Sequence, residues 1–428
     1  MDRLHVRGGR SLEGTVHNAG AKNACLSILS ASLLTKKTLT LSNLPALSDV
    51  DTMLEILQRL GTVVERETQD GVVRCRTSEI AEPTAPWDLV RKMRASFEVL
   101  GPLLGRCGRA RVSYPGGCLI GVRPVDTHLR GLEALGARVR TEGGNVLAEA
   151  PSGGLRGGDV YLGTPAGSSV GATRNVLMAA VLARGTSVLS SAACEPEVVD
   201  LAHCLQAMGA DIEGAGSPTI TVRGVDGLDG AEHAIIPDRI EAGTFLVAGA
   251  LTGGRVRVEG VRPDHHSALL DAFVRAGVPI EKGGDWIETQ TRDPRLDPLR
   301  PTDITTQPYP GFPTDLQAQW MALMLAVPGV SIITETIFED RYMHLPELAR
   351  LGASVRRHAN SAIVCGGKRL SGANLMASDL RASAALVLAG LIAEGKTTIH
   401  RVYHIDRGYE RIEARLGALG ATIRREQQ

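Results

Sequence analysis

One short pattern recurs six times along this sequence, a helix-type segment that ends in glycine and is followed by a strand-type run. The copies are LQRLGTVV, LEALGARV, LQAMGADI, FVRAGVPI, LARLGASV and LGALGATI. Their closing glycines lie 68 to 75 residues apart, at Gly61, Gly136, Gly209, Gly277, Gly352 and Gly420. Glycine adopts the left-handed conformation that closes a helix, and apolar alternation after it starts a strand. The pattern predicts six structural units of about 70 residues that account for the whole chain.

Each unit also contains an earlier and more apolar helix. These segments are AKNACLSILSASLL, RASFEVLGPLLG, VGATRNVLMAAVLA, IEAGTFLVAGAL, PTDLQAQWMALMLA and DLRASAALVLAGLIA. Apolar residues on nearly every face predict helices that are buried on most sides, with sheets outside them. A unit therefore has the order strand, helix, strand, helix, strand, strand. With 428 residues, the chain is longer than a single hydrophobic core usually organises. We therefore expect an α/β protein of two three-unit domains that meet around a cleft.

The composition excludes several classes of function. Lys plus Arg and Asp plus Glu both number 47, so no net positive charge favours nucleic acid or an acidic membrane surface. The first residues, MDRLHVRGGR, lack the apolar stretch of a signal peptide, and no apolar run is long enough to span a membrane. The seven cysteines have no metal-ligand spacing, and the P-loop, GxGxxG, HExxH and GxSxG motifs are absent. We expect a cytoplasmic protein that uses no metal or cofactor.

Cationic residues stand at corresponding places in several units, at or before the starts of helices. Helix N-termini attract anions, and arginines grip carboxylates and phosphates with two hydrogen bonds. A doubly anionic substrate is therefore expected. An arginine on a solvated surface remains the alternative at each single position. The set comprises Lys22, Arg94, Arg123, Arg341, Arg381 and Arg407.

Two further residues are candidates for chemistry. Cys118 ends the loop segment Tyr114–Cys118, only five residues before Arg123, and a thiol near positive charge can act as a proton donor or nucleophile. An ordinary buried thiol is the alternative. Asp315 lies in GFPTD at the start of a helix, where it serves either as a general base for a substrate hydroxyl or as a helix cap.

Eleven ordered motifs, from one end of the chain to the other, resemble the UDP-N-acetylglucosamine enolpyruvyl transferase family. They are GAKNA (20–24), MRAS (93–96), PGGC (115–118), RPVD (123–126), SVGAT (169–173), EPE (195–197), PDRIEAGTF (237–245), FPTDLQAQ (312–319), TETIFEDRYMH (334–344), DLRAS (379–383) and HIDRGYE (404–410). The resemblance implies an inside-out α/β barrel of two domains, each built from three βαβαββ units around buried helices. It places an N-terminal domain at 22–235 and a C-terminal domain at 1–21 plus 236–428, with the active site in the cleft between them.

The resemblance further implies transfer of the enolpyruvyl group of phosphoenolpyruvate to a uridine nucleotide by addition and elimination, with release of phosphate. Cys118 is then the proton donor to the methylene carbon and a target of fosfomycin, and Asp315 the base at the acceptor hydroxyl. Lys22, Arg123 and Arg407 bind phosphate, Arg341 and Arg381 grip the carboxylate side, and Asp379 helps the intermediate collapse. Substrate contacts are expected also from Asn23, Arg94, Ala95, Pro124, Val125, Asp126, Ser169, Val170, Gly171, Arg174 and Ile337.

Four departures from the family pattern lie around the expected acceptor site. The loop 163–169 is about two residues longer than expected, Arg174 stands where the family commonly has Glu or an uncharged residue, Thr127 replaces a usual leucine, and Ser27 replaces a usual proline. The leading acceptor is the 3-hydroxyl of UDP-N-acetylglucosamine, a precursor of peptidoglycan. The alternative is the 3′-hydroxyl of UMP, as in nikkomycin and polyoxin antibiotic pathways, with Arg174 on its terminal phosphate. A catalytically inactive sugar-nucleotide binder is a third interpretation.

Overall fold

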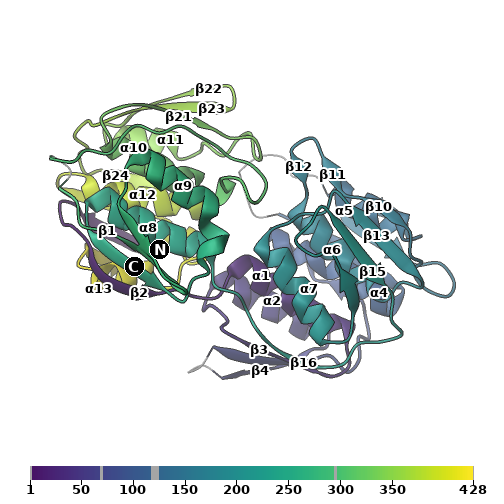
Figure 1. The fold of residues 1–428 in the computed structure, drawn as a ribbon. Helices are drawn as coiled ribbons and strands as arrows, with labels where there is room; N and C mark the ends of the chain where they lie inside the picture. Colours follow the sequence, from purple (N-terminus) through teal and green to yellow (C-terminus); the bar gives the residue numbers. More distant parts are fainter. Residues whose placement is uncertain (1, 68–70, 117–124, 294–295, 428) are drawn as a thin grey trace. The chain divides into compact units, whose positions relative to one another are not determined.

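The computed structural model describes residues 2–67, 71–116, 125–293 and 296–427 (Figure 1). They form two compact units. The N-terminal unit contains residues 20–116 and 125–236. The C-terminal unit contains residues 2–19, 237–293 and 296–427. The C-terminal unit is therefore assembled from two separate stretches of the chain.

The described part of the N-terminal unit contains three four-stranded sheets and one short hairpin. The first sheet has the order β16 (Ala231–Ala234), β3 (Thr38–Ser42), β5 (Val72–Arg76), β4 (Val63–Glu67). The second has the order β6 (Thr84–Ala85), β7 (Arg109–Ser113), β9 (Asn145–Glu149), β8 (Arg138–Glu142). The third has the order β10 (Asp159–Tyr161), β13 (Thr186–Ser190), β15 (Thr219–Arg223), β14 (Asp211–Glu213). The hairpin pairs β11 (Gly163–Thr164) with β12 (Gly167–Ser168).

The C-terminal unit repeats this arrangement in its described residues. Its first sheet has the order β2 (Glu13–His17), β17 (Arg255–Glu259), β19 (Trp286–Thr289), β18 (Ile280–Lys282). The second has the order β20 (Ile304–Thr305), β21 (Gly329–Thr334), β23 (Ser361–Gly366), β22 (Ser354–His358). The third has the order β24 (Asn374–Met376), β25 (Lys396–His400), β1 (Arg3–Arg7), β26 (Thr422–Glu426). In all six sheets the outer strand named first runs parallel to its neighbour, and the other pairs are antiparallel.

Three strands pair with partners that are distant in the sequence. β2 precedes the first helix of the N-terminal unit but pairs with β17 of the C-terminal unit. β16 precedes the first helix of the C-terminal unit but pairs with β3 of the N-terminal unit. β1 lies between β25 and β26, where Leu4 is opposite Ile399 on one side and Arg425 on the other. These strands complete sheets that the neighbouring sequence leaves incomplete.

In the N-terminal unit the helices that begin at Lys22, Arg94 and Val170 start within one residue of the start of a predicted apolar segment. The α-helices are α1 (Lys22–Ala31), α2 (Ser48–Arg59), α3 (Trp87–Val90), α4 (Leu100–Cys107), α5 (Asp126–Ala134), α6 (Val170–Ala180) and α7 (Pro196–Ala207). The 3-10 helices are η1 (Ser32–Leu34), which continues α1, and η2 (Arg94–Val99), which precedes α4.

The helices of the C-terminal unit follow the same alternation with its strands. The α-helices are α8 (Arg239–Thr252), α9 (Ser267–Ala276), α10 (Gln317–Ala326), α11 (Leu345–Arg350), α12 (Leu380–Ile392) and α13 (Ile412–Ala418). The 3-10 helices are η3 (Pro263–His266), η4 (Thr314–Leu316) and η5 (Val402–His404). No helix in the described ranges is both long and apolar enough to cross a lipid bilayer.

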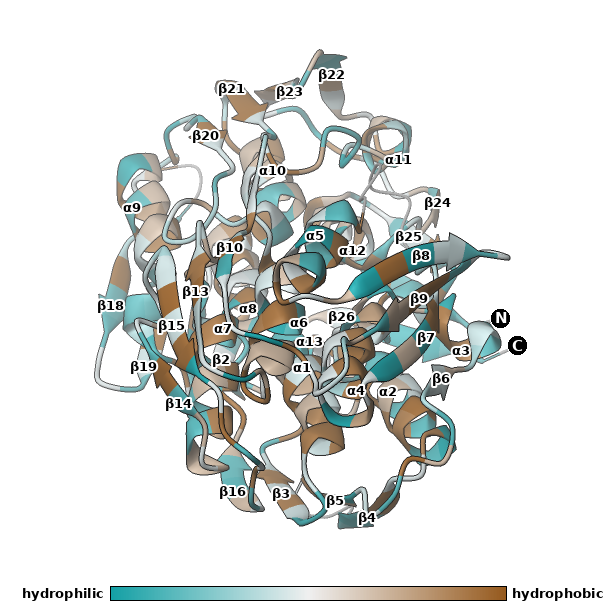
Figure 2. Ribbon diagram, turned by 90° about the vertical axis from the view of Figure 1, so that its right-hand side faces the viewer, coloured by the Kyte–Doolittle hydropathy of each residue, from teal (hydrophilic) through white to brown (hydrophobic). Residues whose placement is uncertain are grey.

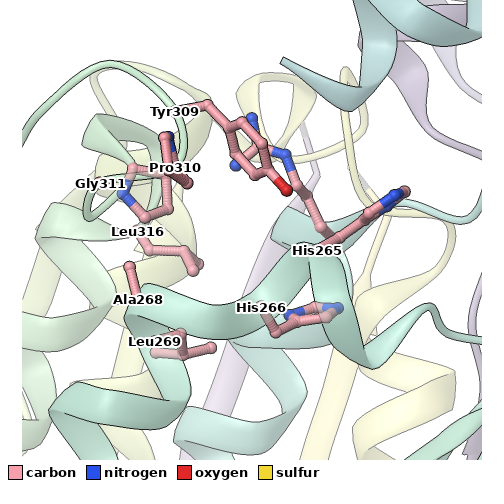
Figure 3. Close-up of a pocket in the computed structure, with 10 residues that line it drawn as sticks. His265, His266, Ala268, Leu269, Tyr309, Pro310, Gly311 and Leu316 are labelled. Carbon is pink, nitrogen blue, oxygen red and sulfur yellow. The ribbon is translucent and has the colours of Figure 1, made fainter. Parts of the chain in front are cut away.

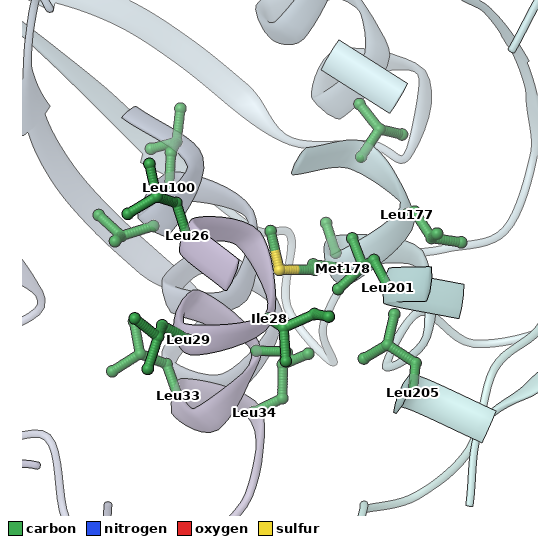
Figure 4. Packing of buried hydrophobic residues seen from close by; sticks show 14 of the residues in the cluster. Leu26, Ile28, Leu29, Leu33, Leu34, Leu100, Leu177, Met178, Leu201 and Leu205 are labelled. Carbon is green, nitrogen blue, oxygen red and sulfur yellow. The ribbon is translucent and has the colours of Figure 1, made fainter. Parts of the chain in front are cut away.

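The apolar first helices form the cores, as their sequences predicted. In the C-terminal unit α8, α10 and α12 pack against one another, and every residue from Leu380 to Leu391 of α12 is buried. In the N-terminal unit leucines of α1, η1, α4, α6 and α7 meet in one cluster (Figure 4). Along β15 the buried Ile220 and Val222 alternate with less buried residues, so hydrophobic and hydrophilic residues follow one another along this strand in Figure 2. Each core is thus made chiefly of helices.

The six repeated glycines close the second helices, and this prediction is confirmed. All six have positive φ, between 79° and 102°. A residue with a Cβ atom adopts this conformation only with strain, so the recurring glycine has a direct backbone cause.

Candidate active site

The start of α1 carries two of the predicted substrate ligands. Lys22 is its first residue and is buried, with its Nζ 3.1 Å from Oδ2 of Asp49 in α2. Asn23 follows it and is partly exposed. No side chain caps this helix and no acidic residue lies in its first turn. The partial positive charge of the helix start is therefore reinforced by the ammonium group, which suits an anionic ligand.

The predicted ligands Arg94 and Ala95 begin η2, and both are partly buried. Val125 precedes α5 and is buried, whereas Asp126 is the exposed first residue of that helix. Ser169 caps α6, because its Oγ accepts from the N–H of Ala172 at 3.3 Å. The N-terminal unit thus has several helix starts that carry predicted substrate ligands.

Gly171, in the first turn of α6, stands against a histidine ring. A Cβ atom at this position would lie 3.2 Å from two atoms of the His128 ring, closer than most such contacts. The position therefore requires a residue without a side chain, or a shift of the ring. Val170, next to it, is partly exposed.

Arg174 does not lie at a surface where a phosphate could reach it freely. Its side chain is 9% exposed, and Nη2 donates to Oε1 of Glu98 at 2.6 Å. Nη1 donates to the carbonyl oxygen of Asn23 at 2.5 Å. Ser27 donates to the other carboxylate oxygen of Glu98 at 2.7 Å. Burial raises the pKa of Glu98, whereas Arg174 and the Ser27 hydroxyl oppose that rise.

His128 is buried beside this ion pair and is neutral. Its Nδ1 is 3.0 Å from Nδ2 of Asn175, whose Oδ1 accepts from the N–H of Gly101 at 2.6 Å. Because that bond fixes the orientation of the amide, Asn175 donates to Nδ1, and the imidazole proton is on Nε2. Burial, together with the charges of Arg94 and Arg174, lowers the pKa of His128 to about 3.

In the C-terminal unit the predicted base Asp315 is paired with both arginines that were predicted to bind a carboxylate. Its Oδ1 is 2.7 Å from Nη1 of Arg341, and its Oδ2 is 3.0 Å from Nη2 and 3.2 Å from Nε of Arg381. The two arginine side chains are buried, whereas that of Asp315 is 24% exposed. Two guanidinium groups therefore converge on one carboxylate that solvent can reach.

The buried phenol of Tyr409 contacts the Asp315 cluster through Arg381. Tyr409 Oη accepts from Nη1 of Arg381 at 3.3 Å and lies 2.8 Å from the hydroxyl of Thr244. Gln319 donates to Tyr409 at 3.2 Å and to the carbonyl oxygen of Asp315 at 2.9 Å. Burial raises the pKa of Tyr409, so the phenol keeps its proton. Sequence reasoning missed Tyr409 and Thr244, although both lie in motifs that carry the family resemblance.

Glu335 organises the loop that contains the predicted ligand Ile337. Its Oε1 accepts from the N–H groups of Ile337 at 2.8 Å and Phe338 at 3.0 Å, and its Oε2 accepts from Thr314 at 2.8 Å. The same Thr314 hydroxyl accepts from Arg341 at 2.9 Å. This carboxylate therefore links the Ile337 loop to the Asp315 cluster.

Asp379 is the N-cap of α12. Its Oδ1 accepts from the N–H groups of Arg381 and Ala382, each at 3.0 Å, which fixes the first turn that presents Arg381. His344 is buried nearby, and burial together with Arg341 lowers its pKa to about 4, although Asp379 opposes the change. Arg407 is partly buried between η5 and α13.

Three predicted site residues, Cys118, Arg123 and Pro124, lie outside the described residues. The remaining ones fall into two groups. Lys22, Asn23, Arg94, Ala95, Val125, Asp126, Ser169, Val170, Gly171 and Arg174 belong to the N-terminal unit, and Asp315, Ile337, Arg341, Asp379, Arg381 and Arg407 belong to the C-terminal unit. Within the described ranges, no three His, Cys, Asp or Glu side chains are grouped to hold a metal ion.

A small pocket in the C-terminal unit adjoins the Asp315 helix (Figure 3). Arg239, Tyr309, His265 and His266 supply its polar walls, and Leu316 of η4 lines it as well. The Arg239 guanidinium carbon lies 5.5 Å from the centre of the Tyr309 ring. Among the residues that the structure describes, no predicted catalytic side chain lines this pocket, which the sequence did not indicate.

Comparisons with known proteins converge on one family. The model described as EPSP synthase (3-phosphoshikimate 1-carboxyvinyltransferase) matches residues 6–416. The UDP-N-acetylglucosamine 1-carboxyvinyltransferases of Rhodospirillum centenum and Maricaulis maris are each 52% identical to this chain, over 99% of it and 99% of their own length.

Solved structures agree with this assignment. The enolpyruvyl transferase NikO from Streptomyces tendae is 27% identical, with a TM-score of 0.89 over 99% of this chain and 98% of its own. EPSP synthase from Acinetobacter baumannii, at 17% identity and a TM-score of 0.74 over the whole of both chains, shares the fold. The chain therefore belongs to the EPSP synthase family and, within it, to the UDP-N-acetylglucosamine 1-carboxyvinyltransferases.

Proposed function

We propose that this enzyme transfers the enolpyruvyl group of phosphoenolpyruvate to the 3-hydroxyl of UDP-N-acetylglucosamine and releases phosphate. The observation that carries the proposal is the 52% identity to enzymes of that name over nearly the whole of both chains. The product is a precursor of peptidoglycan. We place the reaction in the cytoplasm, where phosphoenolpyruvate is formed, and no cofactor takes part in it.

The reaction consists of an addition followed by an elimination. A proton is added to the methylene carbon of phosphoenolpyruvate while the acceptor oxygen, which loses its proton to a base, bonds to the neighbouring carbon. The resulting tetrahedral intermediate then loses a proton from its methyl group, the double bond forms again, and the carbon–oxygen bond to phosphate breaks. Positive charge develops first and negative charge leaves last, so cationic groups fixed around the phosphate stabilise the transition states.

The two groups of residues suit the two ends of this reaction. Lys22, at the uncapped start of α1, supplies positive charge for phosphate, and Arg123 and Arg407 join it in the proposed complex. Cys118 donates the proton to the methylene carbon, and we expect its thiol to be the group that fosfomycin alkylates. Asn23, Arg94 and the start of α6 contact the nucleotide acceptor. We propose that the two units form an inside-out α/β barrel pair and act on the same substrates from either side of a cleft.

The Asp315 cluster gives the C-terminal unit a specific part in substrate binding. Arg341 and Arg381 both bond Asp315 in the substrate-free chain. The carboxylate of phosphoenolpyruvate competes for the same guanidinium groups, and its arrival frees an oxygen of Asp315 to accept the proton of the acceptor hydroxyl. Asp379, fixed at the start of α12, takes part in the collapse of the intermediate. Substrate binding and activation of the base are thereby coupled.

UMP is the competing acceptor. The resemblance to NikO, at 27% identity, keeps this alternative in the experiment. The sequence supported UMP as the acceptor through one residue, Arg174, which was predicted to bind its terminal phosphate. That support is removed, because both terminal nitrogens of Arg174 are bonded to Glu98 and to the Asn23 carbonyl inside the unit.

The experiment measures phosphate release from phosphoenolpyruvate with UDP-N-acetylglucosamine and with UMP, offered separately. We expect turnover with the sugar nucleotide and its loss in Cys118→Ala. The matched control is Cys194→Ala, which removes a partly buried thiol of the N-terminal unit and keeps turnover. Turnover with UMP alone would assign the enzyme to the other acceptor. Absence of release with either nucleotide would favour an inactive binding protein.

A further inference from the structure

We propose that Glu98 and Arg174 form a buried positioning pair, which fixes the start of α1 for binding of the acceptor nucleotide. The inference rests on the proposed function and concerns how this chain builds the nucleotide side of its site. It assigns Arg174 a role through Asn23 rather than a direct contact with phosphate.

The first argument is geometric. Arg174 lies in α6, Glu98 in η2 and Asn23 in α1, so one guanidinium group joins three elements. The bond to the Asn23 carbonyl acts on the peptide group that follows the predicted ligands Lys22 and Asn23. Arg94 and Ala95 begin the helix that contains Glu98, and Ser169 to Gly171 begin the helix that contains Arg174. A displacement of the pair would therefore move three groups of predicted ligands.

The second argument concerns burial. Glu98 is 4% and Arg174 is 7% exposed, and Ser27 is fully buried. Removing two charges from water is costly, and well-packed apolar residues at such places often give equal or greater stability. Stability alone therefore does not account for the pair. A buried pair with directed bonds does restrict the geometry of the elements it joins.

The third argument comes from the departures in the sequence. Ser27 and Arg174, which the resemblance marks as departures from the family pattern, lie 147 residues apart in the chain. In the structure both donate to the carboxylate of Glu98, one to each oxygen. The Ser27 Oγ also lies 3.3 Å from the Asn23 carbonyl oxygen, so the side chains of Ser27 and Arg174 converge on the same two groups. Ser27 and Arg174 thus belong to one hydrogen-bond network, which reaches the start of α1, where predicted substrate ligands lie.

The network extends to two further elements through the residue after Arg174. Asn175 donates to His128 of α5 and accepts from Gly101 at the start of α4. Thr127, another departure, precedes His128 and accepts from Arg130 at 3.4 Å, outside this network. The positioning role is therefore assigned to Glu98, Arg174 and Ser27 alone.

The test compares four variants in the full-length enzyme. The double variant Glu98→Leu with Arg174→Met replaces the pair by apolar side chains, Arg174→Met removes one partner, and Arg174→Lys keeps the charge without the planar fork. The matched control is Arg106→Met. Arg106 donates to the carbonyl oxygens of Leu33 and Thr35, each at 2.8 Å, at the end of η1, which continues α1.

Two quantities are measured in addition to Tm. The first is the rate of amide hydrogen exchange in the peptide that covers the first turns of α1, in the protein without substrate. The second is KM for UDP-N-acetylglucosamine and, separately, KM for phosphoenolpyruvate. For the double variant we expect an unchanged Tm, about tenfold faster exchange and an acceptor KM raised about tenfold, the order of one charge-assisted hydrogen bond. Arg174→Lys recovers part of both losses, and Arg106→Met lowers Tm without raising the acceptor KM.

Three outcomes would overturn the inference. Unchanged exchange and unchanged acceptor KM in the double variant would show that the pair only fills space. A raised acceptor KM with unchanged exchange would show that Arg174 touches the nucleotide itself. An equal rise in both KM values would show a loss of general order. The exchange measurement needs no substrate, so it decides the positioning role even where the wild-type enzyme shows no turnover and the proposed function fails.

Discussion

The neutral, buried His128 makes the stability of the N-terminal unit depend on pH in a calculable way. Its Nδ1 accepts a hydrogen bond from Asn175, and the amide of Asn175 is held in that orientation by Gly101. A second proton on the ring would turn this acceptor into a donor that faces another donor. Burial and the two nearby arginines act in the same direction and lower the pKa of His128 to about 3. Replacement of His128 by asparagine keeps the acceptor and removes the titrating group.

The magnitude follows from the difference in proton binding. In the unfolded chain a histidine titrates near pH 6.5, whereas in the folded chain this one does so at about 3. Below pH 6.5 the unfolded state therefore binds a proton that the folded state does not, and stability falls as the pH falls until about 3. Between pH 7 and pH 5 this single group removes about 2 kcal/mol from the free energy of unfolding.

Unfolding of the N-terminal unit is measured through the reactivity of its own buried thiols. Cys25 and Cys204 are buried there, and burial raises the pKa of Cys204 to about 12, so these thiols react only after unfolding. Labelling with dithiodipyridine, which reacts with thiols at acidic pH, is followed by mass spectrometry along a urea gradient at pH 7 and pH 5. The labelling midpoints and slopes give the free energy of unfolding of this unit at each pH.

We expect the loss of stability between pH 7 and pH 5 to be about 2 kcal/mol smaller in His128→Asn than in the wild type. The control is His203→Asn, which exchanges an exposed histidine on α7 of the same unit and keeps the wild-type difference. Equal pH dependence in wild type and His128→Asn would refute the reasoning, because it would mean that the folded unit accommodates the charged ring.

Three further predictions concern the C-terminal unit. Asp315→Asn removes the proposed base, so we expect turnover to fall at least about 100-fold. It also removes the carboxylate that competes for Arg341 and Arg381, so phosphoenolpyruvate should bind more tightly in a calorimetric titration. Weaker binding would contradict this competition. Arg381→Lys loses the two-point grip, and we expect its Kd for phosphoenolpyruvate to rise about tenfold, whereas an unchanged Kd would exclude Arg381 from that grip. Leu4→Ala, in the fully buried middle of a sheet, lowers the free energy of unfolding by about 3 kcal/mol, measured by the fluorescence of buried Trp320; a loss below about 1 kcal/mol would show that β1 contributes little.

The local structure was largely predictable from the sequence, because its causes are local. A glycine that closes a helix needs positive φ wherever it stands, and all six have it. Helices that are apolar on every side must be buried, and α8 and α12 are. The pairing of β16 with β3 was not predictable in this way, since nothing in four residues of an edge strand specifies a partner about 190 residues earlier in the chain.

In the candidate site, too, contacts between residues far apart in the sequence were not predictable. Charge at or before a helix start predicts that Lys22, Arg341 and Arg381 are anion ligands, but charge alone does not reveal which carboxylate an arginine meets after folding. Glu98 lies within an otherwise apolar segment, 76 residues from Arg174, and only the fold brings the two together. Arg174 therefore looked like a phosphate ligand in the sequence, and its position inside the unit could be found only from the structure.

The place of β1 has a consequence for how the protein is made. This strand is synthesised before the other described strands, yet both of its neighbours, β25 and β26, lie after residue 395. At ribosomal rates of about 5–20 residues per second, it waits roughly 20 to 80 seconds for them. In the N-terminal unit β3 waits for β16, which lies about 190 residues later in the chain, and this takes roughly half that time. During translation β1 thus acquires both of its partners late, and a chaperone that shields apolar strands would have to cover residues 3–7 for longer than it covers β3.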